Sequence, residues 1–225
     1  MGFTLFTLSE LSLFLINTLI KFKDEREKKN WASMMFIIML IFAIFRGSGD
    51  ADYYNYLWFA KDIGTDFSKV IDFSYPVEFS FRLFSYLINV LGISRQWIIV
   101  IMNILSIIPV SFISIKCSPN PFLSALIFLP IFIQFDMQTA RTATAVGLGL
   151  MSIYFFSQKR WFKSLLFFIF AFSFHRASII LLPFLFLMAF RMGNTFKIIT
   201  AAAAFMVSVF SSLMFKTCLL YTSPS

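Results

Sequence analysis

Charged side chains are scarce in this sequence of 225 residues, where Asp, Glu, Lys and Arg together make up only 13%. Soluble domains carry about 25% charged residues, so this chain has too little polar surface to cover a water-facing exterior. Hydrophobic residues make up 59% of the sequence, and phenylalanine alone contributes 33 residues. Most of the surface must therefore face lipid or other helices.

Cysteine and histidine are also rare. The two cysteines, Cys117 and Cys218, lie far apart in the sequence and form neither a disulfide framework nor a metal site. The single histidine, His175, excludes a multi-histidine metal centre. The sequence lacks a Walker loop, a dinucleotide fingerprint and a His-Glu-x-x-His motif, so we expect no cofactor. Any reaction would use an activated substrate that arrives through the lipid.

The formal net charge of +8 does not indicate nucleic-acid binding. That function needs basic residues gathered on one polar face or arm. Here the basic residues lie in short clusters between apolar runs, which is the pattern that the positive-inside rule produces in membrane proteins.

Apolar runs of helical length fill most of the chain. A spanning helix needs about 20 mostly apolar residues, within a range of about 17–25. We therefore predict an all-α fold, a polytopic transmembrane helical bundle of about eight spanning helices over residues 1–217. Several of the runs reach a full span only with flanking polar residues. The candidate runs are Phe3–Ile20, Trp31–Phe45, Trp97–Ile115, Pro121–Phe135, Thr142–Phe156, Trp161–Phe174, Ala177–Phe190 and Phe196–Phe215.

The apolar segment Phe79–Ile93 contains Arg82 near its start, so we predict a re-entrant or interfacial segment there. Five basic residues in Lys21–Lys29 predict a cytoplasmic loop. The N-terminus is then extracytoplasmic, and residues 46–78 form an extracytoplasmic loop. Because Phe79–Ile93 does not span in this topology, the basic residues of Lys159–Lys163 also fall inside. The same topology places four polar residues at the outer face of the membrane: Asp136, Arg141, His175 and Arg176.

The two ends of the sequence lead to separate predictions. Phe3–Ile20 has no basic residues before it and contains Glu10, so we interpret it as a retained helix rather than a signal peptide. Residues 218–225 resemble the translation of a transposon sequencing adapter, and the alternative is a short polar tail. We leave them out of the fold and expect the natural protein to continue beyond Lys216 with further helices.

The first candidate site follows the second predicted helix. Arg46 is followed by two glycines that allow a tight turn with exposed backbone N–H groups, which suits an anion. The carboxylates and tyrosines after them are typical of sugar contact, because they offer polar edges and ring faces. The alternative is a solvated loop with Arg46 at the headgroup level. The candidates after Arg46 are Asp50, Asp52, Tyr53 and Tyr56.

Arg141 and His175 define two further candidates. Arg141 leads a helix rich in small residues, and its rigid five-donor fork matches phosphate oxygens. A salt bridge to Asp136, or snorkelling, is the alternative. His175 precedes Arg176 at a helix junction and can accept a proton from an attacking hydroxyl near neutral pH. The alternative is a structural histidine.

In their order along the chain, these groups resemble the EpsG-like family of bacterial exopolysaccharide membrane proteins, akin to Wzy O-antigen and capsule polymerases. The resemblance covers about Trp31 to Phe190. It rests on Phe45-Arg46-Gly47 with Gly49-Asp50 and a Tyr-rich stretch, Glu78 before an apolar helix, Arg141 followed by alanines, Gln158-Lys159-Arg160, and Phe174-His175 with Ser178 and Pro183.

The resemblance implies a multi-pass protein of the bacterial cytoplasmic membrane. Such a protein would polymerise undecaprenyl-diphosphate-linked oligosaccharide repeat units into exopolysaccharide, capsule or O-antigen at the outer face. It would be a glycosyltransferase without nucleotide or required metal, whose partners are the lipid-linked glycan, membrane lipid and other assembly proteins. Arg141 and His175 would be catalytic. The substrate-binding residues would be Arg46, Asp50, Asp52, Tyr53, Tyr56, Glu78 and Arg176. A transporter or flippase of lipid-linked oligosaccharide and a non-catalytic membrane subunit are the alternatives.

Overall fold

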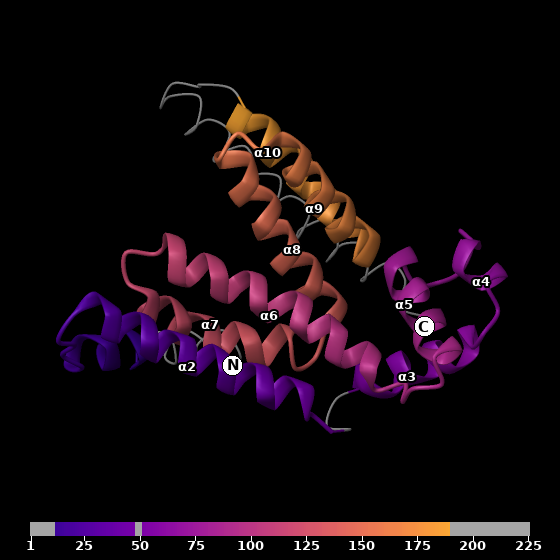
Figure 1. Cartoon of the computed structure of the whole chain (residues 1–225), viewed down its shortest axis with the longest axis horizontal. Helices are drawn as coiled ribbons and strands as arrows, with labels where there is room; N and C mark the ends of the chain where they lie inside the picture. The colour runs from indigo at the N-terminus through magenta and orange to yellow at the C-terminus, as the bar shows by residue number, and fades with distance from the viewer. Residues whose placement is uncertain (1–11, 48–50, 190–225) are drawn as a thin grey trace, which may run out of the picture. The chain divides into compact units, whose positions relative to one another are not determined.

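The fold is taken from a computed structural model that describes residues 12–47 and 51–189 (Figure 1). The described residues contain helices and no strand, so the all-α prediction is confirmed for this part of the chain. The chain divides into two compact units, Met1–Leu181 and Leu182–Ser225. Residues 3–11 of the first candidate span, all of Phe196–Phe215 and the tail 218–225 lie outside the described residues, whereas residues 12–19 are helical.

The predicted apolar runs correspond closely to the observed helices. α7 and α9 begin and end at the predicted residues, and α2 begins six residues before the predicted start at Trp31. The early start has a local cause, because the Asp24 carboxylate accepts a hydrogen bond of 2.7 Å from the Glu27 N–H and caps the helix. The helices are α2 Glu25–Ile44, α3 Ala51–Ile63, α4 Ser68–Ile71, α5 Phe79–Val90, α6 Trp97–Cys117, α7 Pro121–Phe135, α8 Ala140–Ser157, α9 Trp161–Phe174, the 3₁₀ helix η1 Arg176–Ile180, and α10 Leu181–Ala189.

The segment 46–78, expected as a loop, is largely helical where it is described. It contains α3 and α4, and α3 buries Tyr53, Tyr56, Ala60 and Ile63. The spacing of these four residues is three, four and three, which is the stripe of an amphipathic helix. The amphipathic spacing is therefore present in the sequence, although the many Asp and Tyr residues of this segment favoured its interpretation as a loop.

Among the described helices, α6 alone has both the length and the hydropathy of a complete membrane span. α5 has 12 residues and rises about 18 Å at 1.5 Å per residue, so by itself it is too short to cross a hydrocarbon core of about 30 Å. Arg82 of α5 is buried, and its guanidinium donates to the backbone carbonyls of Lys69 and Asp72. Arg82 thus ties α5 to the residues around α4.

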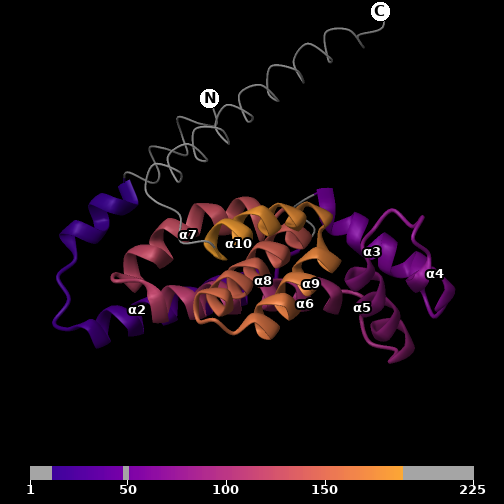
Figure 2. The ribbon, with the colours of Figure 1, turned by 90° about the horizontal axis from the view of Figure 1, so that it is seen from above.

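Helix α8 packs along α9 and against α6 (Figures 1 and 2). Its contact with α6 is very close, because a Cβ added at Gly147 would lie 2.6 Å from the Ser106 carbonyl oxygen. One turn earlier, the Thr144 hydroxyl lies 2.9 Å from the Met102 carbonyl oxygen. On the α9 side, the hydroxyls of Ser152 and Ser164 donate to each other's carbonyl oxygens at 2.8 and 2.9 Å.

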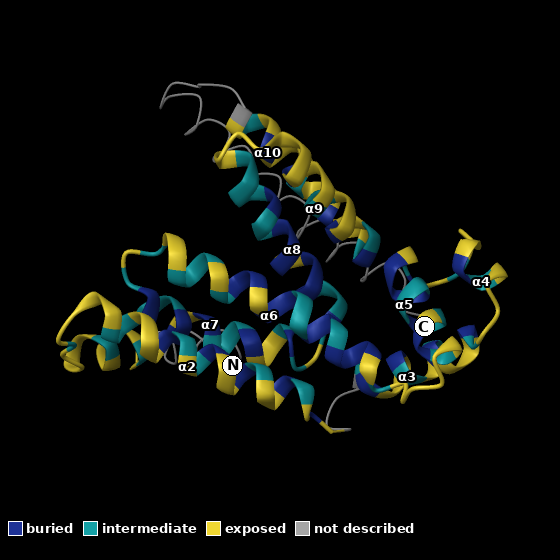
Figure 3. Ribbon diagram, viewed as in Figure 1, coloured by how far each residue is buried: buried dark blue, intermediate teal, exposed yellow. Residues whose placement is uncertain are grey.

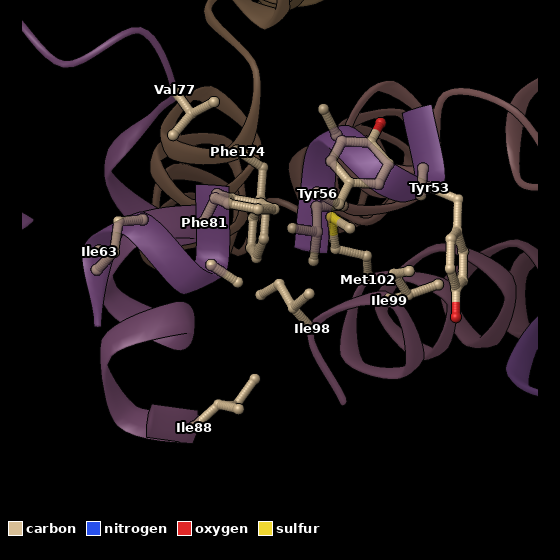
Figure 4. Close-up of a cluster of buried hydrophobic side chains, with 14 of the residues drawn as sticks. Tyr53, Tyr56, Ile63, Val77, Phe81, Ile88, Ile98, Ile99, Met102 and Phe174 are labelled. Carbon is tan, nitrogen blue, oxygen red and sulfur yellow. The ribbon is translucent and has the colours of Figure 1, made fainter. Parts of the chain in front are cut away.

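Buried positions occur on several helices of the first unit (Figure 3). Their apolar residues form two clusters. One joins α3, α5, α6, α8 and α9 and includes Tyr56, Phe81, Met102 and Phe174 (Figure 4). The other joins α2, α6 and α7 and includes Phe36. α6 contributes to both clusters, so it connects the α2–α7 side of the unit with the α3–α5 side.

Replacing Gly147 by Ala will destabilise the protein, because the new methyl group forces α8 away from α6. Overpacking of this kind costs about 1–3 kcal/mol. The matched control is Val146→Ala at the adjacent, exposed position of the same helix. Thermal unfolding of the detergent-purified variants will show a lower melting temperature for Gly147→Ala than for the control. Equal melting temperatures would contradict the close helix contact.

Candidate functional site

Three distant parts of the chain meet at the Glu78 carboxylate. Glu78 Oε2 accepts a hydrogen bond of 2.8 Å from Arg141 Nη1, and its other oxygen, Oε1, lies 3.3 Å from His175 Nδ1. We call Glu78, Arg141, His175 and the underlying Tyr56 the Glu78 cluster. Glu78 was expected as a separate sugar-binding residue, and the structure places it between the two candidate catalytic residues.

Helix ends position the three ionisable groups. Glu78 is the N-cap residue of α5, and its side chain makes no capping hydrogen bond to the helix. Arg141 is the second residue of α8. His175 ends α9, where its backbone is extended, and its carbonyl accepts a hydrogen bond from the Ser178 N–H at the turn into η1. All three groups lie at helix ends, so they come together without interrupting a helix.

Tyr56 forms the floor of the cluster. The Arg141 guanidinium lies 5.7 Å from the centroid of the Tyr56 ring, within the range of a cation–π contact. The Tyr56 hydroxyl donates a hydrogen bond of 3.3 Å to Asp52 Oδ2. Burial, together with the neighbouring Asp52 carboxylate, raises the pKa of the Tyr56 phenol. The phenol is therefore neutral at physiological pH and remains a hydrogen-bond donor.

The exposure of the cluster suits ligand binding. The side chains of Glu78, Arg141 and His175 are 12%, 26% and 33% exposed, so the guanidinium and the imidazole are more accessible than the carboxylate between them. His175 Nδ1 faces Glu78 Oε1, so Nε2 is the ring nitrogen that remains available to a ligand. The Arg141 fork keeps donors that Glu78 does not use, and such donors match phosphate oxygens.

The alternative pair of Asp136 with Arg141 is not formed. Arg141 contacts Glu78 instead, and the backbone carbonyl of Asp136 accepts a hydrogen bond of 2.6 Å from Arg46 Nη1. Both Arg46 and Asp136 are buried. Asp136 therefore lies at the end of α7 in contact with Arg46, and it is not part of the Glu78 cluster.

Arg46 lies at the end of an apolar cleft between α2 and α7. The cleft has a volume of about 1110 Å³, and its polar residues include Arg46, Asp52, Gln138 and Thr139. Asp52 connects this end of the cleft to the Glu78 cluster, because it also binds the Tyr56 hydroxyl. The apolar walls are formed by Ile38, Met39, Ile41, Phe42, Phe45, Leu129, Phe132, Ile133 and Met137.

The remaining predicted site residues have different surroundings. Tyr53 and Tyr56 are buried in the core (Figure 4), so neither ring offers an open face to a sugar, and the structure gives both rings packing roles. Arg176 is exposed at the start of η1. Asp50 lies outside the described residues. In the described ranges no group of three or more His, Cys, Asp or Glu side chains could hold a metal ion.

Sequence reasoning missed Gln96, which precedes α6. Its Oε1 accepts a hydrogen bond of 2.8 Å from the Tyr53 hydroxyl, and its Nε2 donates to the Arg46 carbonyl at 3.3 Å. Gln96 therefore connects α3, the end of α2 and the start of α6. No motif could have revealed it, because its partners lie 43 and 50 residues away in the sequence.

The fold and the Glu78 cluster define an all-helical, strongly apolar protein with an ion-paired site at converging helix ends. The sequence matches the model of the EpsG family over residues 5–224, and the chain belongs to that family. The resemblance drawn from the motifs is thereby confirmed. The family associates the chain with exopolysaccharide biosynthesis and with membranes. No curated protein and no solved structure matches the chain.

The pairing of Arg141 with Glu78 can be measured by a double-mutant cycle. The stability losses of Glu78→Gln and Arg141→Gln will be non-additive, with a coupling of about 0.5–3 kcal/mol, because the two side chains are in direct contact. The control cycle combines Asp136→Asn with Arg141→Gln and is expected to be additive. Chemical unfolding in detergent provides the free energies of unfolding. Coupling to Asp136 and additivity with Glu78 would contradict the cluster.

Proposed function

We propose that the chain polymerises oligosaccharide repeat units carried on undecaprenyl diphosphate, at the outer face of the bacterial cytoplasmic membrane. The growing glycan on one lipid carrier is transferred to a repeat unit on another. The observation that carries this proposal is the Glu78 cluster, in which an arginine fork and a histidine share one carboxylate. Membership of the EpsG family supports it.

The proposed reaction forms one glycosidic bond and breaks one bond to diphosphate. A hydroxyl of the acceptor sugar attacks the anomeric carbon of the donor, and the bond from that carbon to the diphosphate oxygen breaks. His175 Nε2 takes the hydroxyl proton, and Glu78 stabilises the resulting imidazolium. Arg141 binds the departing diphosphate. Since polyprenyl diphosphate is already a good leaving group, the protein acts mainly by positioning and charge stabilisation.

The α2–α7 cleft supports a lipid-linked substrate. Its walls are almost wholly apolar and match an isoprenoid chain, whereas Arg46 supplies a buried positive charge at one end. The Asp52–Tyr56 hydrogen bond leads from this end to Arg141. An isoprenoid in the cleft would thus direct its diphosphate toward the Glu78 cluster.

The proposal requires a multi-pass placement in the membrane. α6 has 21 residues and rises about 31 Å, which is close to the thickness of the hydrocarbon core. The shorter apolar helices α7 and α9 would complete their spans with flanking residues. With Lys21–Lys29 in the cytoplasm, the N-terminus and residues 46–78 face the exterior.

Cysteine labelling tests this topology. With Cys117 and Cys218 replaced by Ser, a cysteine at position 62 will react with a membrane-impermeant maleimide in intact cells, and a cysteine at position 160 will react only after lysis. Both positions are exposed, so accessibility of the side chain does not separate them. Labelling at 160 but not at 62 in intact cells would overturn the orientation.

Substitution of Arg141 tests the polymerase. Arg141→Ala will abolish long chains, since removing one such contact in a preorganised site costs about 10²–10³ in rate. Arg141→Lys will restore little, because a lysine is a point charge and cannot bind a diphosphate bidentately. Single repeat units will accumulate on the lipid carrier. The measurement is polymer length in a complemented deletion strain, together with the amount of protein in the membrane.

The matched control for this experiment is Arg160→Ala, an exposed arginine at the start of α9. It is expected to support polymer of normal length. Normal chains from Arg141→Ala at normal protein level would end the proposal. Repeat units that accumulate at the cytoplasmic face, rather than the outer face, would favour the flippase alternative.

A further inference from the structure

We propose that the outer face of α3 and the α5–α6 connection form a binding site for an acidic saccharide, distinct from the Glu78 cluster. The site is a cleft of about 620 Å³. Its role in holding the polymer rests on the proposed function, whereas saccharide binding itself does not. Its lining residues include Tyr54, Trp58, Lys61, Asn89, Arg95 and Gln96.

Two aromatic rings form a platform on α3. Tyr54 and Trp58 are four residues apart, so they lie on one face of the helix, and each is 60% exposed. This face lies opposite the stripe that includes Tyr53 and Tyr56, which is buried. Edge contacts with Tyr53 and Phe59 hold the two rings at centroid distances of 5.6 and 5.0 Å. Exposed rings fixed in this way present apolar faces that can stack on the C–H face of a pyranose.

The charge of the cleft selects an acidic ligand. Lys61 and Arg95 line it, and none of its lining residues is Asp or Glu. This composition contrasts with the surrounding segment 46–78, which carries six Asp or Glu residues against three Lys or Arg residues. The nearby Asp62 carboxylate is already paired with Lys69 and the Tyr75 hydroxyl. A uronic acid carboxylate is therefore the ligand charge that complements Lys61 and Arg95.

Hydrogen bonds within the protein hold the floor of the cleft. Asn89 Nδ2 donates to the carbonyls of Ala60 and Ser85 at 2.7 Å each. Asn89 Oδ1 accepts a bond of 3.1 Å from Arg95 Nε, which orients the guanidinium and leaves its terminal nitrogens for a carboxylate. Gly92, with φ +67°, forms the turn that brings Arg95 over Asn89. Such preorganisation reduces the entropy lost on binding.

The cleft also contacts the residues that line the α2–α7 cleft. Gln96 lines this cleft and donates to the Arg46 carbonyl at 3.3 Å, and Arg46 lines the α2–α7 cleft. A glycan whose lipid carrier occupies the α2–α7 cleft could thus extend across α3 onto Tyr54 and Trp58. This extension of the glycan depends on the proposed function.

Direct binding to the purified full chain in detergent tests the inference. The probe is a tetrasaccharide of alternating glucuronic acid and N-acetylglucosamine, and the comparison is neutral chitotetraose; saturation-transfer NMR and calorimetry measure binding. The acidic probe will bind, and the neutral one will bind at least about tenfold more weakly. Trp58→Ala will lower the affinity for the acidic probe about tenfold, because one ring contact is lost. Trp58→Phe will retain most of the affinity.

The matched control is Trp161→Ala, which removes an equally accessible tryptophan outside the cleft and should bind the probe like the wild type. A second variant, Lys61→Glu with Arg95→Glu, should lose the preference for the acidic probe. The proposal would be overturned if the acidic probe did not bind at millimolar concentration, or if the Trp161 control lost as much affinity as Trp58→Ala. It would also be overturned by a Trp58→Ala variant that binds the probe normally but binds phosphatidylglycerol vesicles poorly. The last result would make the rings a membrane-interface anchor.

Discussion

The close contact of α8 with α6 is the constraint on which the site depends. Gly147 allows the α8 backbone to approach Ser106 to a distance that no side chain permits, and this contact sets the position of the first turn of α8, where Arg141 lies. The reciprocal serine bonds between α8 and α9 then position α9, which ends at His175. Two of the three ionisable groups of the Glu78 cluster are therefore placed by contacts between helices rather than by their own contacts.

The chain holds its charged groups in two different ways. Arg46 and Arg82 are buried, and backbone carbonyls are among their hydrogen-bond acceptors, so their donors stabilise helix ends and connections. Arg141 and His175 remain partly exposed and share one carboxylate. A buried charge must be satisfied within the protein, whereas a partly exposed one retains donors for a ligand. This difference separates Arg46 and Arg82 from the residues of the Glu78 cluster.

Helix α3 has two distinct faces, one buried and one exposed. Its inner stripe packs into the core with α5, α6 and α9, and its Tyr56 forms the floor beneath Arg141. Its outer face presents Tyr54 and Trp58 beside Lys61. The helix thus lies between the Glu78 cluster and the proposed saccharide cleft, and the hydrogen bonds of Gln96 hold this side of the unit to the end of α2.

The pattern of residues along the chain predicted the helical fold, the family, and Arg141, His175 and Glu78 as candidates. Apolar runs and helix periodicity are local signals, so the bounds of α7 and α9 follow from them directly. The pairing of Glu78 with Arg141, 63 residues away, is visible in the folded chain alone. The same holds for the burial of Tyr53 and Tyr56 and the exposure of Tyr54 and Trp58. Pairing and burial depend on which helices touch, and that choice is made by packing at contacts such as Gly147 with Ser106, which no local pattern encodes.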